Sequence, residues 1–125
     1  MNQEINTGER ARFSKFVFML LSWGFVACIV LQTLFAGMAL FNNPDHWSRH
    51  VTFVHFFEFV PLLMLIFAFT GRLPRGIKWS CLALLAMIFF QYMSAHVPAA
   101  GAFHPVMALG LIVLSLRVAV KSSKR

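Results

Sequence analysis

Acidic residues are scarce in this chain, as are cysteine and tyrosine. Only four of its 125 residues are Asp or Glu, and charged residues of both signs make up 12%, about half of their share in a soluble domain. Apolar residues make up 59% and include fifteen phenylalanines. A chain of this size cannot hide so much apolar surface in a water-soluble core. Ordinary soluble, disordered, collagen-like and disulfide-stabilised domains are therefore excluded, and lipid is the expected solvent.

The cysteines and the basic residues agree with a membrane protein. Cys28 and Cys81 lie inside apolar stretches, at different expected depths, so we expect no disulfide and interpret both as small apolar side chains. The net charge of +7 comes from short basic groups between the apolar stretches, with no basic stripe and no nucleic-acid-binding motif. Such charges are typical of residues that flank membrane spans. The expected partner is a lipid bilayer, and nucleic acid is not expected.

Four apolar stretches each approach the ~20 residues that a helix needs to cross hydrocarbon. They cover about residues 16–40, 51–70, 79–95 and 103–120. Lipid cannot satisfy free backbone groups, so these stretches are expected to be helices. The first is too long for a signal-peptide core, which has ~7–15 apolar residues, and is expected to remain as a span. The sequence predicts an all-α fold, a single domain 1–125 that forms an integral membrane four-helix bundle.

The distribution of basic residues predicts how this bundle is oriented. Three basic residues precede the first stretch, three lie between the second and third, and four lie at the C-terminal end, in and after the last turn of the fourth stretch. The other two connections contain only Arg49. Because basic residues concentrate on the cytoplasmic side, both termini are expected to be cytoplasmic, and the loop with Arg49 faces outward.

All the histidines fall near the expected outer surface. They are His46, His50, His55, His96 and His104. Glu58 lies inside the second stretch, where an ionised carboxylate costs ~2–3 kcal/mol or more. His55 and Glu58 are three residues apart and share a helix face, whereas His50 and His55 are about 140° apart with Glu58 between them. The pattern predicts one polar sector that points into the bundle.

Other polar residues extend this sector to the neighbouring helices. Gln32 on the first stretch and Gln91 on the third are expected to support the histidines. His46 is expected to be an ordinary interfacial residue, and the role of His96 at a helix end is left open. A purely structural network, in which His55, Glu58 and Gln91 bond helices together, is also left open.

Several of these segments resemble a family of small four-span bacterial membrane proteins known only as a domain of unknown function. The resemblance spans about residues 28–120. It is carried by residues 50–58 (HVTFVHFFE), 71–74 (GRLP), 91–92 (QY) and 103–106 (FHPV), with 31–32 and 36–37 earlier in the chain. It implies a four-helix fold in a bacterial plasma membrane, and it implies no activity.

No catalytic or phosphate-binding motif is present, so inward-facing imidazoles indicate a bound cofactor. The first hypothesis is b-type haem, held near the outer face for electron transfer or haem handling. His55 and His104 are the expected ligands, with His50 as an alternative. Arg49 is expected to meet the haem propionates at the surface. Whether the chain also catalyses a reaction is left open.

Two other hypotheses remain beside haem. The first is a non-haem ion, Zn, Cu or Fe, and imidazoles with a carboxylate are suitable ligands for it. Its expected ligands are His50, His55, Glu58, His96 and His104. The other is a structural accessory subunit of a larger membrane complex, and a homodimer also stays possible. A transporter is the least supported reading, because no inverted repeat or broken helix is recognised.

Overall fold

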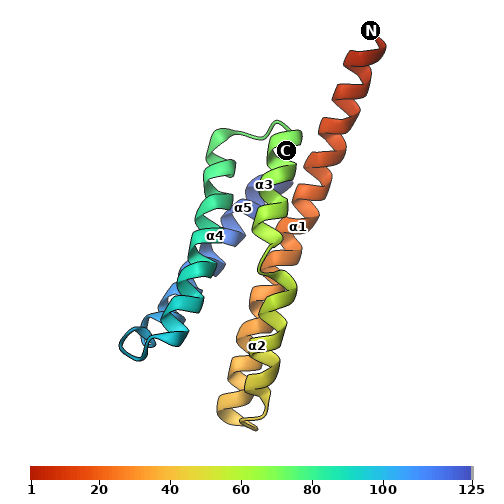
Figure 1. The fold of residues 1–125 in the computed structure, drawn as a ribbon. Helices are drawn as coiled ribbons and strands as arrows, with labels where there is room; N and C mark the ends of the chain where they lie inside the picture. Colours follow the sequence, from red (N-terminus) through yellow and green to blue (C-terminus); the bar gives the residue numbers. More distant parts are fainter. Residues whose placement is uncertain (125) are drawn as a thin grey trace.

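The structure is a computed structural model that describes residues 1–124 (Figure 1). Over this range it contains helices and no strand. The helices are α1 (Asn2–Phe41), α2 (His46–Phe57), α3 (Val60–Thr70), α4 (Arg75–His96) and α5 (Phe103–Ser123), with a short 3₁₀ helix, η1, at Pro98–Ala100. Four helical stretches are long and apolar enough to cross a membrane, because α2 and α3 together count as one. The predicted all-α membrane bundle is confirmed.

The helices run further than the predicted spans at their polar ends. The first span was expected to begin near residue 16, but α1 begins at Asn2 and has 40 residues. At ~1.5 Å per residue such a helix is about 60 Å long, twice the hydrocarbon thickness of ~30 Å. Its N-terminal part accordingly projects beyond the other helices (Figure 1).

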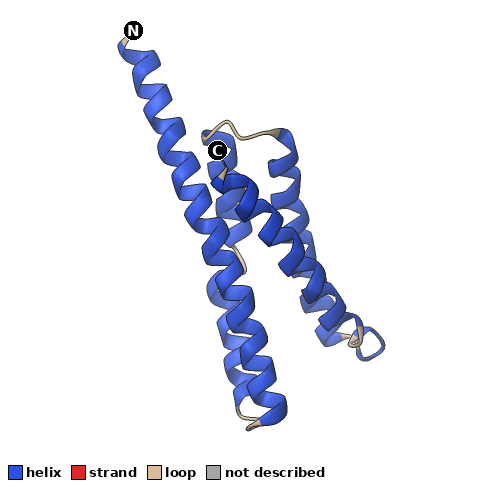
Figure 2. Cartoon of the chain, turned by 180° about the vertical axis from the view of Figure 1, so that it is seen from behind, coloured by secondary structure: helices blue, strands red, loops and turns tan. Residues whose placement is uncertain are grey.

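The second predicted span, 51–70, differs more from the structure. It begins five residues earlier, at His46, and is interrupted at Glu58 and Phe59, between α2 and α3 (Figure 2). Pro61 has no N–H that could donate to the Phe57 carbonyl. The N–H groups of Leu62 and Leu63 both donate to the Phe59 carbonyl, at 3.0 and 3.2 Å. The helix therefore restarts at Phe59 instead of continuing through Glu58.

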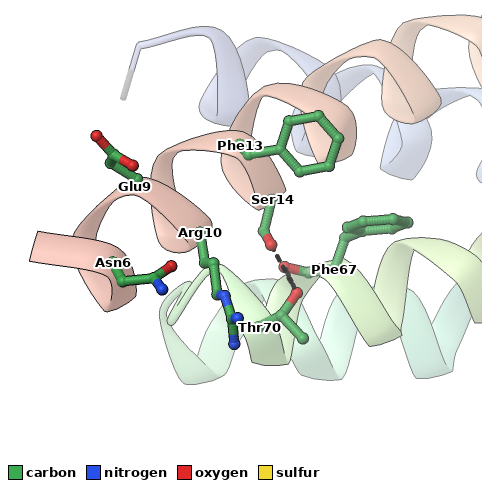
Figure 3. Close-up of a pocket in the computed structure, with 7 residues that line it drawn as sticks. All are labelled: Asn6, Glu9, Arg10, Phe13, Ser14, Phe67 and Thr70. Carbon is green, nitrogen blue, oxygen red and sulfur yellow. Dashed lines mark hydrogen bonds between the residues drawn. The ribbon is translucent and has the colours of Figure 1, made fainter. Parts of the chain in front are cut away.

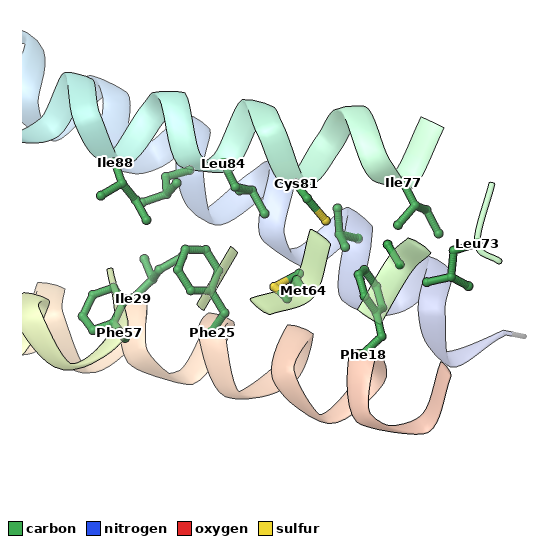
Figure 4. Close-up of a cluster of buried hydrophobic side chains, with 13 residues drawn as sticks. Phe18, Phe25, Ile29, Phe57, Met64, Leu73, Ile77, Cys81, Leu84 and Ile88 are labelled. Carbon is green, nitrogen blue, oxygen red and sulfur yellow. The ribbon is translucent and has the colours of Figure 1, made fainter. Parts of the chain in front are cut away.

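A buried apolar cluster runs along the middle of the bundle and draws on α1 to α5 (Figure 4). Phe18 and Phe25 of α1, Met64 of α3 and Leu84 of α4 are fully buried in it. Large apolar side chains are also exposed over the outside of the bundle. A protein that is apolar both in its core and on its exterior is suited to a lipid environment.

The helices pack in two pairs that separate toward one end. α1 packs against α2, α3 and α5, and α4 packs against α3 and α5. The α1–α2 pair and the α4–α5 pair diverge at the end formed by the connections 42–45 and 97–102 (Figure 1). We call this end the histidine end, and the opposite end, which holds both termini, the terminal end.

Gly71 lies where α3 approaches α1 at the terminal end. A Cβ at this position would lie 2.8 Å from the Phe67 carbonyl oxygen and 3.3 Å from the backbone nitrogen of Lys15. The Phe67 carbonyl in the last turn of α3 and the nearby backbone of α1, and not a positive φ, are what require glycine here.

Gly71→Ala is therefore expected to lower the free energy of unfolding by about 1–3 kcal/mol. The matched control is Gly24→Ala in α1, where an added Cβ meets no atom within 4 Å. This control is expected to be neutral or to stabilise by up to about 1 kcal/mol. Unfolding in mixed micelles measures both variants, and equal stability of the two would contradict the packing argument.

Candidate functional site

All five histidines lie at the histidine end, as the sequence predicts. His46 and His50 belong to the first turns of α2, His96 ends α4, and His104 is the second residue of α5. His55 lies five residues beyond His50, about 7.5 Å deeper along the helix. The structure divides these residues into two groups, one around His50 and His104 and one around His55.

His50 is tied to Gln32 on the neighbouring helix α1. The side-chain amide of Gln32 donates to the His50 carbonyl at 2.7 Å. In return, Nδ1 of His50 lies 2.9 Å from the backbone carbonyl oxygen of Gln32. A carbonyl only accepts, so Nδ1 of His50 carries the proton in this bond. The side chain of Gln32 also leaves its Oε1 atom buried with no hydrogen-bond partner among the described residues.

His104 is held in the same way by α4. Its Nδ1 lies 3.0 Å from the backbone carbonyl oxygen of Gln91 and 3.3 Å from the Ser94 hydroxyl. The side chain of Gln91, with its amide oriented to satisfy both ends, donates to the His104 carbonyl at 2.8 Å and accepts from the Ala108 N–H at 3.2 Å. These bonds fix where α5 begins relative to α4. Because a carbonyl only accepts, the contact with the Gln91 backbone oxygen also places the proton of His104 on Nδ1.

The imidazoles of His50, on α2, and His104, on α5, lie next to each other at the end where these two helices separate. Their ring centroids are 6.2 Å apart, with 62° between the ring planes. Trp47 packs against the other side of His50 at 5.7 Å. Because a carbonyl holds the proton of each ring on Nδ1, Nε2 of each neutral ring keeps a free lone pair. Metal-binding histidines are commonly oriented by such a bond from their second nitrogen.

The second group consists of His55, Glu58 and Tyr92. The Tyr92 hydroxyl, from α4, donates to the Glu58 carboxylate in a short hydrogen bond. Nδ1 of His55 lies 3.2 Å from the Tyr92 hydroxyl and 3.4 Å from Oε2 of Glu58. The rings of His55 and Tyr92 stack, with centroids 6.0 Å apart. Residues far apart in sequence thus join α2 to α4.

Tyr92 was not recognised as a site residue from the sequence. It is the one tyrosine of the chain, and it precedes His96 by one helical turn. A phenol inside an apolar stretch, at about the depth of Glu58, was the signal that could have indicated its partner.

The structure does not bring the five predicted metal ligands together at one site. His96 contacts the second group only through the backbone of Tyr92, with Nδ1 2.7 Å from the Tyr92 carbonyl oxygen. His55 contacts Glu58 and Tyr92, whereas His104 contacts His50. Within residues 1–124, no three His, Cys, Asp or Glu side chains are close enough together to hold a metal ion.

A comparison with known protein families identifies the family of this chain. Residues 32–101, more than half of its length, match the family of unknown function DUF6220. The chain belongs to the DUF6220 family. The resemblance to an uncharacterised family, predicted from the sequence, is thereby confirmed. No curated protein and no solved structure matches the chain.

The matched region of this DUF6220 member contains most of both groups. It begins at Gln32 and includes His50, Glu58 and Tyr92, whereas His104 follows it by three residues. The family assigns no chemistry, so the function has to be argued from the geometry of the site.

Two hollows lie outside both groups. One of about 430 Å³, at the terminal end, is lined by Asn6, Glu9 and Arg10 of α1 and by Phe67 and Thr70 of α3 (Figure 3). There the Thr70 hydroxyl donates to the Ser14 hydroxyl at 2.8 Å.

The other hollow, of about 300 Å³, is formed by α1 and α2 at the histidine end. It is lined by Phe35, Ser48, Arg49, Thr52, Phe53 and Phe56. Arg49, expected beside the haem propionates, therefore lines a hollow that does not include His50 or His104.

Proposed function

We propose that this protein is an integral membrane haem protein that binds one b-type haem between α2 and α5. His50 and His104 would hold its iron, and its role is electron transfer or haem handling near the outer face. Bound haem would supply one-electron oxidation and reduction at its iron. The chain's own part is to present two imidazoles of fixed tautomer from different helices and to surround them with apolar side chains.

The observation that carries this proposal is the pairing of two preorganised imidazoles. Nδ1 of His50 and Nδ1 of His104 each donate to a backbone carbonyl of a neighbouring helix, at 2.9 and 3.0 Å. Each ring is thus held with Nε2 as the free ligand atom. The bonds on Nδ1 come from the backbone, so side-chain substitution cannot remove them directly.

The number of ligands favours haem over an inorganic ion. A haem iron takes one or two ligands from the protein, so two imidazoles are enough to hold it, whereas zinc sites use three or four protein ligands. A metal about 2.0 Å from each nitrogen, with about 1.2 Å more to each ring centre, would keep two ring centroids within about 6.4 Å. The ring centroids of His50 and His104 are 6.2 Å apart, which agrees with this limit. The imidazoles of His55 and His96 contact other groups.

One observation supports an inorganic ion as the second candidate. The Oε1 atom of Gln32 is buried and unpartnered on the helix that holds His50. The Gln32 side chain contacts the His50 backbone, and its amide oxygen would add a third neutral ligand to an iron or zinc ion held by the two imidazoles.

An absorption spectrum and elemental analysis of one purified preparation separate the two candidates. A Soret band with stoichiometric iron is the expected result. A colourless protein that retains zinc or non-haem iron would favour the second candidate. A colourless, metal-free protein would contradict both and leave the accessory-subunit hypothesis.

We also propose that both termini are cytoplasmic and that the protein lies in a bacterial plasma membrane. Of the ten basic residues in the described range 1–124, nine lie toward the terminal end, and Arg49 alone lies at the histidine end. In a Cys28→Ala/Cys81→Ala background, Asn43→Cys is expected to react with an impermeant maleimide on intact cells. Gly76→Cys is expected to react only after lysis. The reverse pattern would overturn the proposed orientation.

A further inference from the structure

The His55, Glu58 and Tyr92 group lies at an open seam between α2 and α4. The main packing of α2 is against α1, and that of α4 is against α3 and α5. The side chain of Tyr92 bridges the seam to Glu58 and His55. This group is separate from the His50 and His104 pair and has no part in the proposed haem ligation.

His55 faces the surroundings of the bundle and not its core. Its side chain is 58% exposed, whereas that of Glu58 is 18% exposed. Phe56 and Phe59, on the same turn, are 79% and 63% exposed. An imidazole on the lipid-facing surface of a span is costly without a polar partner. The seam thus presents a polar group to molecules that arrive from the bilayer.

The hydrogen bonds within the group determine what such a molecule must supply. Tyr92 has one hydroxyl proton and donates it to Oε2 of Glu58. Nδ1 of His55, beside the Tyr92 oxygen and Oε2 of Glu58, is then the N–H of its ring. Two acceptors remain, Nε2 of His55 and Oε1 of Glu58. Neither has a hydrogen-bond partner in the part of the chain that the structure describes.

We propose that this seam binds the head group of a lipid-soluble hydroquinone. A hydroquinone carries two O–H donors on one flat ring, and these complement the two free acceptors. The exposed ring of Phe59, four residues from His55, offers an aromatic surface against which such a ring can pack. The corresponding quinone has carbonyl oxygens in place of the hydroxyls and so lacks the donors. The proposal concerns binding alone and does not depend on haem.

Calorimetric titration tests this with duroquinol and duroquinone as probes. The full-length protein is reconstituted in phosphatidylcholine nanodiscs and titrated without oxygen. Duroquinol is expected to bind about tenfold or more tightly than duroquinone, because only duroquinol can donate hydrogen bonds to the carboxylate and the imidazole. Equal affinities, or no binding of duroquinol, would overturn the proposal.

Two variants locate the site, and a third is the control. Glu58→Gln removes the carboxylate, and His55→Phe replaces an exposed imidazole with a ring that lipid accommodates, so the bundle should still fold. Each is expected to weaken duroquinol binding about tenfold. Glu9→Gln makes the same chemical change on the projecting part of α1 and is expected to retain wild-type affinity. Unchanged affinity in both site variants would contradict the assignment.

Haem content, measured on the same samples from the Soret absorbance, separates this proposal from the previous one. His55→Phe is expected to lose duroquinol binding and to keep the wild-type haem content. A haem-free protein that still prefers duroquinol would contradict only the haem proposal.

Discussion

His50→Ala and His104→Ala are each expected to lower the haem content to below about one tenth of wild type. Each substitution removes one of the two proposed axial ligands and leaves the remaining imidazole alone at the iron. Both residues lie in the first turns of their helices, and alanine is a good helix former. The proteins should therefore insert and fold. Soret absorbance per protein, after purification in mild detergent, measures the loss.

His55→Ala and His46→Ala serve as matched controls, because both make the same chemical change at the histidine end. His55 is engaged with Glu58 and Tyr92, and His46 opens α2 at the surface. Both variants are expected to keep haem at the wild-type level. Haem loss in His55→Ala, with full haem in His50→Ala, would show that the ligand pair expected from the sequence was right and that the pair proposed from the structure is wrong.

The fold was predictable because lipid leaves a chain few choices. Backbone groups in hydrocarbon must bond within a helix, so a long apolar stretch is enough to predict a span. The turn-forming clusters between the stretches marked the connections at 42–45, 71–74 and 97–102. The sequence also placed the five histidines at one end, because helix length alone determines depth.

The interruption at Glu58 and Phe59 was not predicted, although its cause is visible in the sequence. Pro61 removes a donor, but membrane helices often contain proline, because neighbouring groups satisfy the freed carbonyl. Hydropathy is insensitive to such a break, since the residues on both sides are equally apolar. The span stays one apolar stretch from His46 to Thr70.

The choice between His50 and His55 depended on how α2 is rotated about its axis. The two residues are about 140° apart on the helix, so they do not face α5 equally. Packing against α1 sets the rotation, through contacts such as Phe25 against Phe57 at 5.9 Å between ring centroids. A single sequence shows the helix faces but not which face meets which neighbour.

The sequence pattern also could not predict which hydrogen-bond partner orients each imidazole. The sequence indicated the side chains of Gln32 and Gln91 as supporting groups, and the structure places both residues beside histidines. The atoms that accept the Nδ1 protons are the backbone carbonyls of these residues. Every residue has a carbonyl, so composition and spacing carry no sign of which one is used.

Phe25→Ala is expected to cause the largest loss of stability, about 3–5 kcal/mol. The Phe25 side chain is fully buried in α1 and meets the edge of Phe57, which is the last residue of α2 and only 4% exposed. Alanine would leave a cavity where α2 ends, next to the interruption of the second span. Because Phe25 positions α2, the cavity is also expected to loosen the hold on His50 and to lower the affinity for haem.

Phe56→Ala is the matched control, because it deletes the same atoms from a side chain that is 79% exposed. Its expected effect on the free energy of unfolding is within about 0.5 kcal/mol. Reversible unfolding in mixed micelles, followed by circular dichroism, compares the two variants. Since lipid replaces the contacts of Phe56 but cannot fill a closed cavity at Phe25, the difference between them measures packing inside the bundle. Equal losses would contradict the view that packing of α2 on α1 sets the geometry of the site.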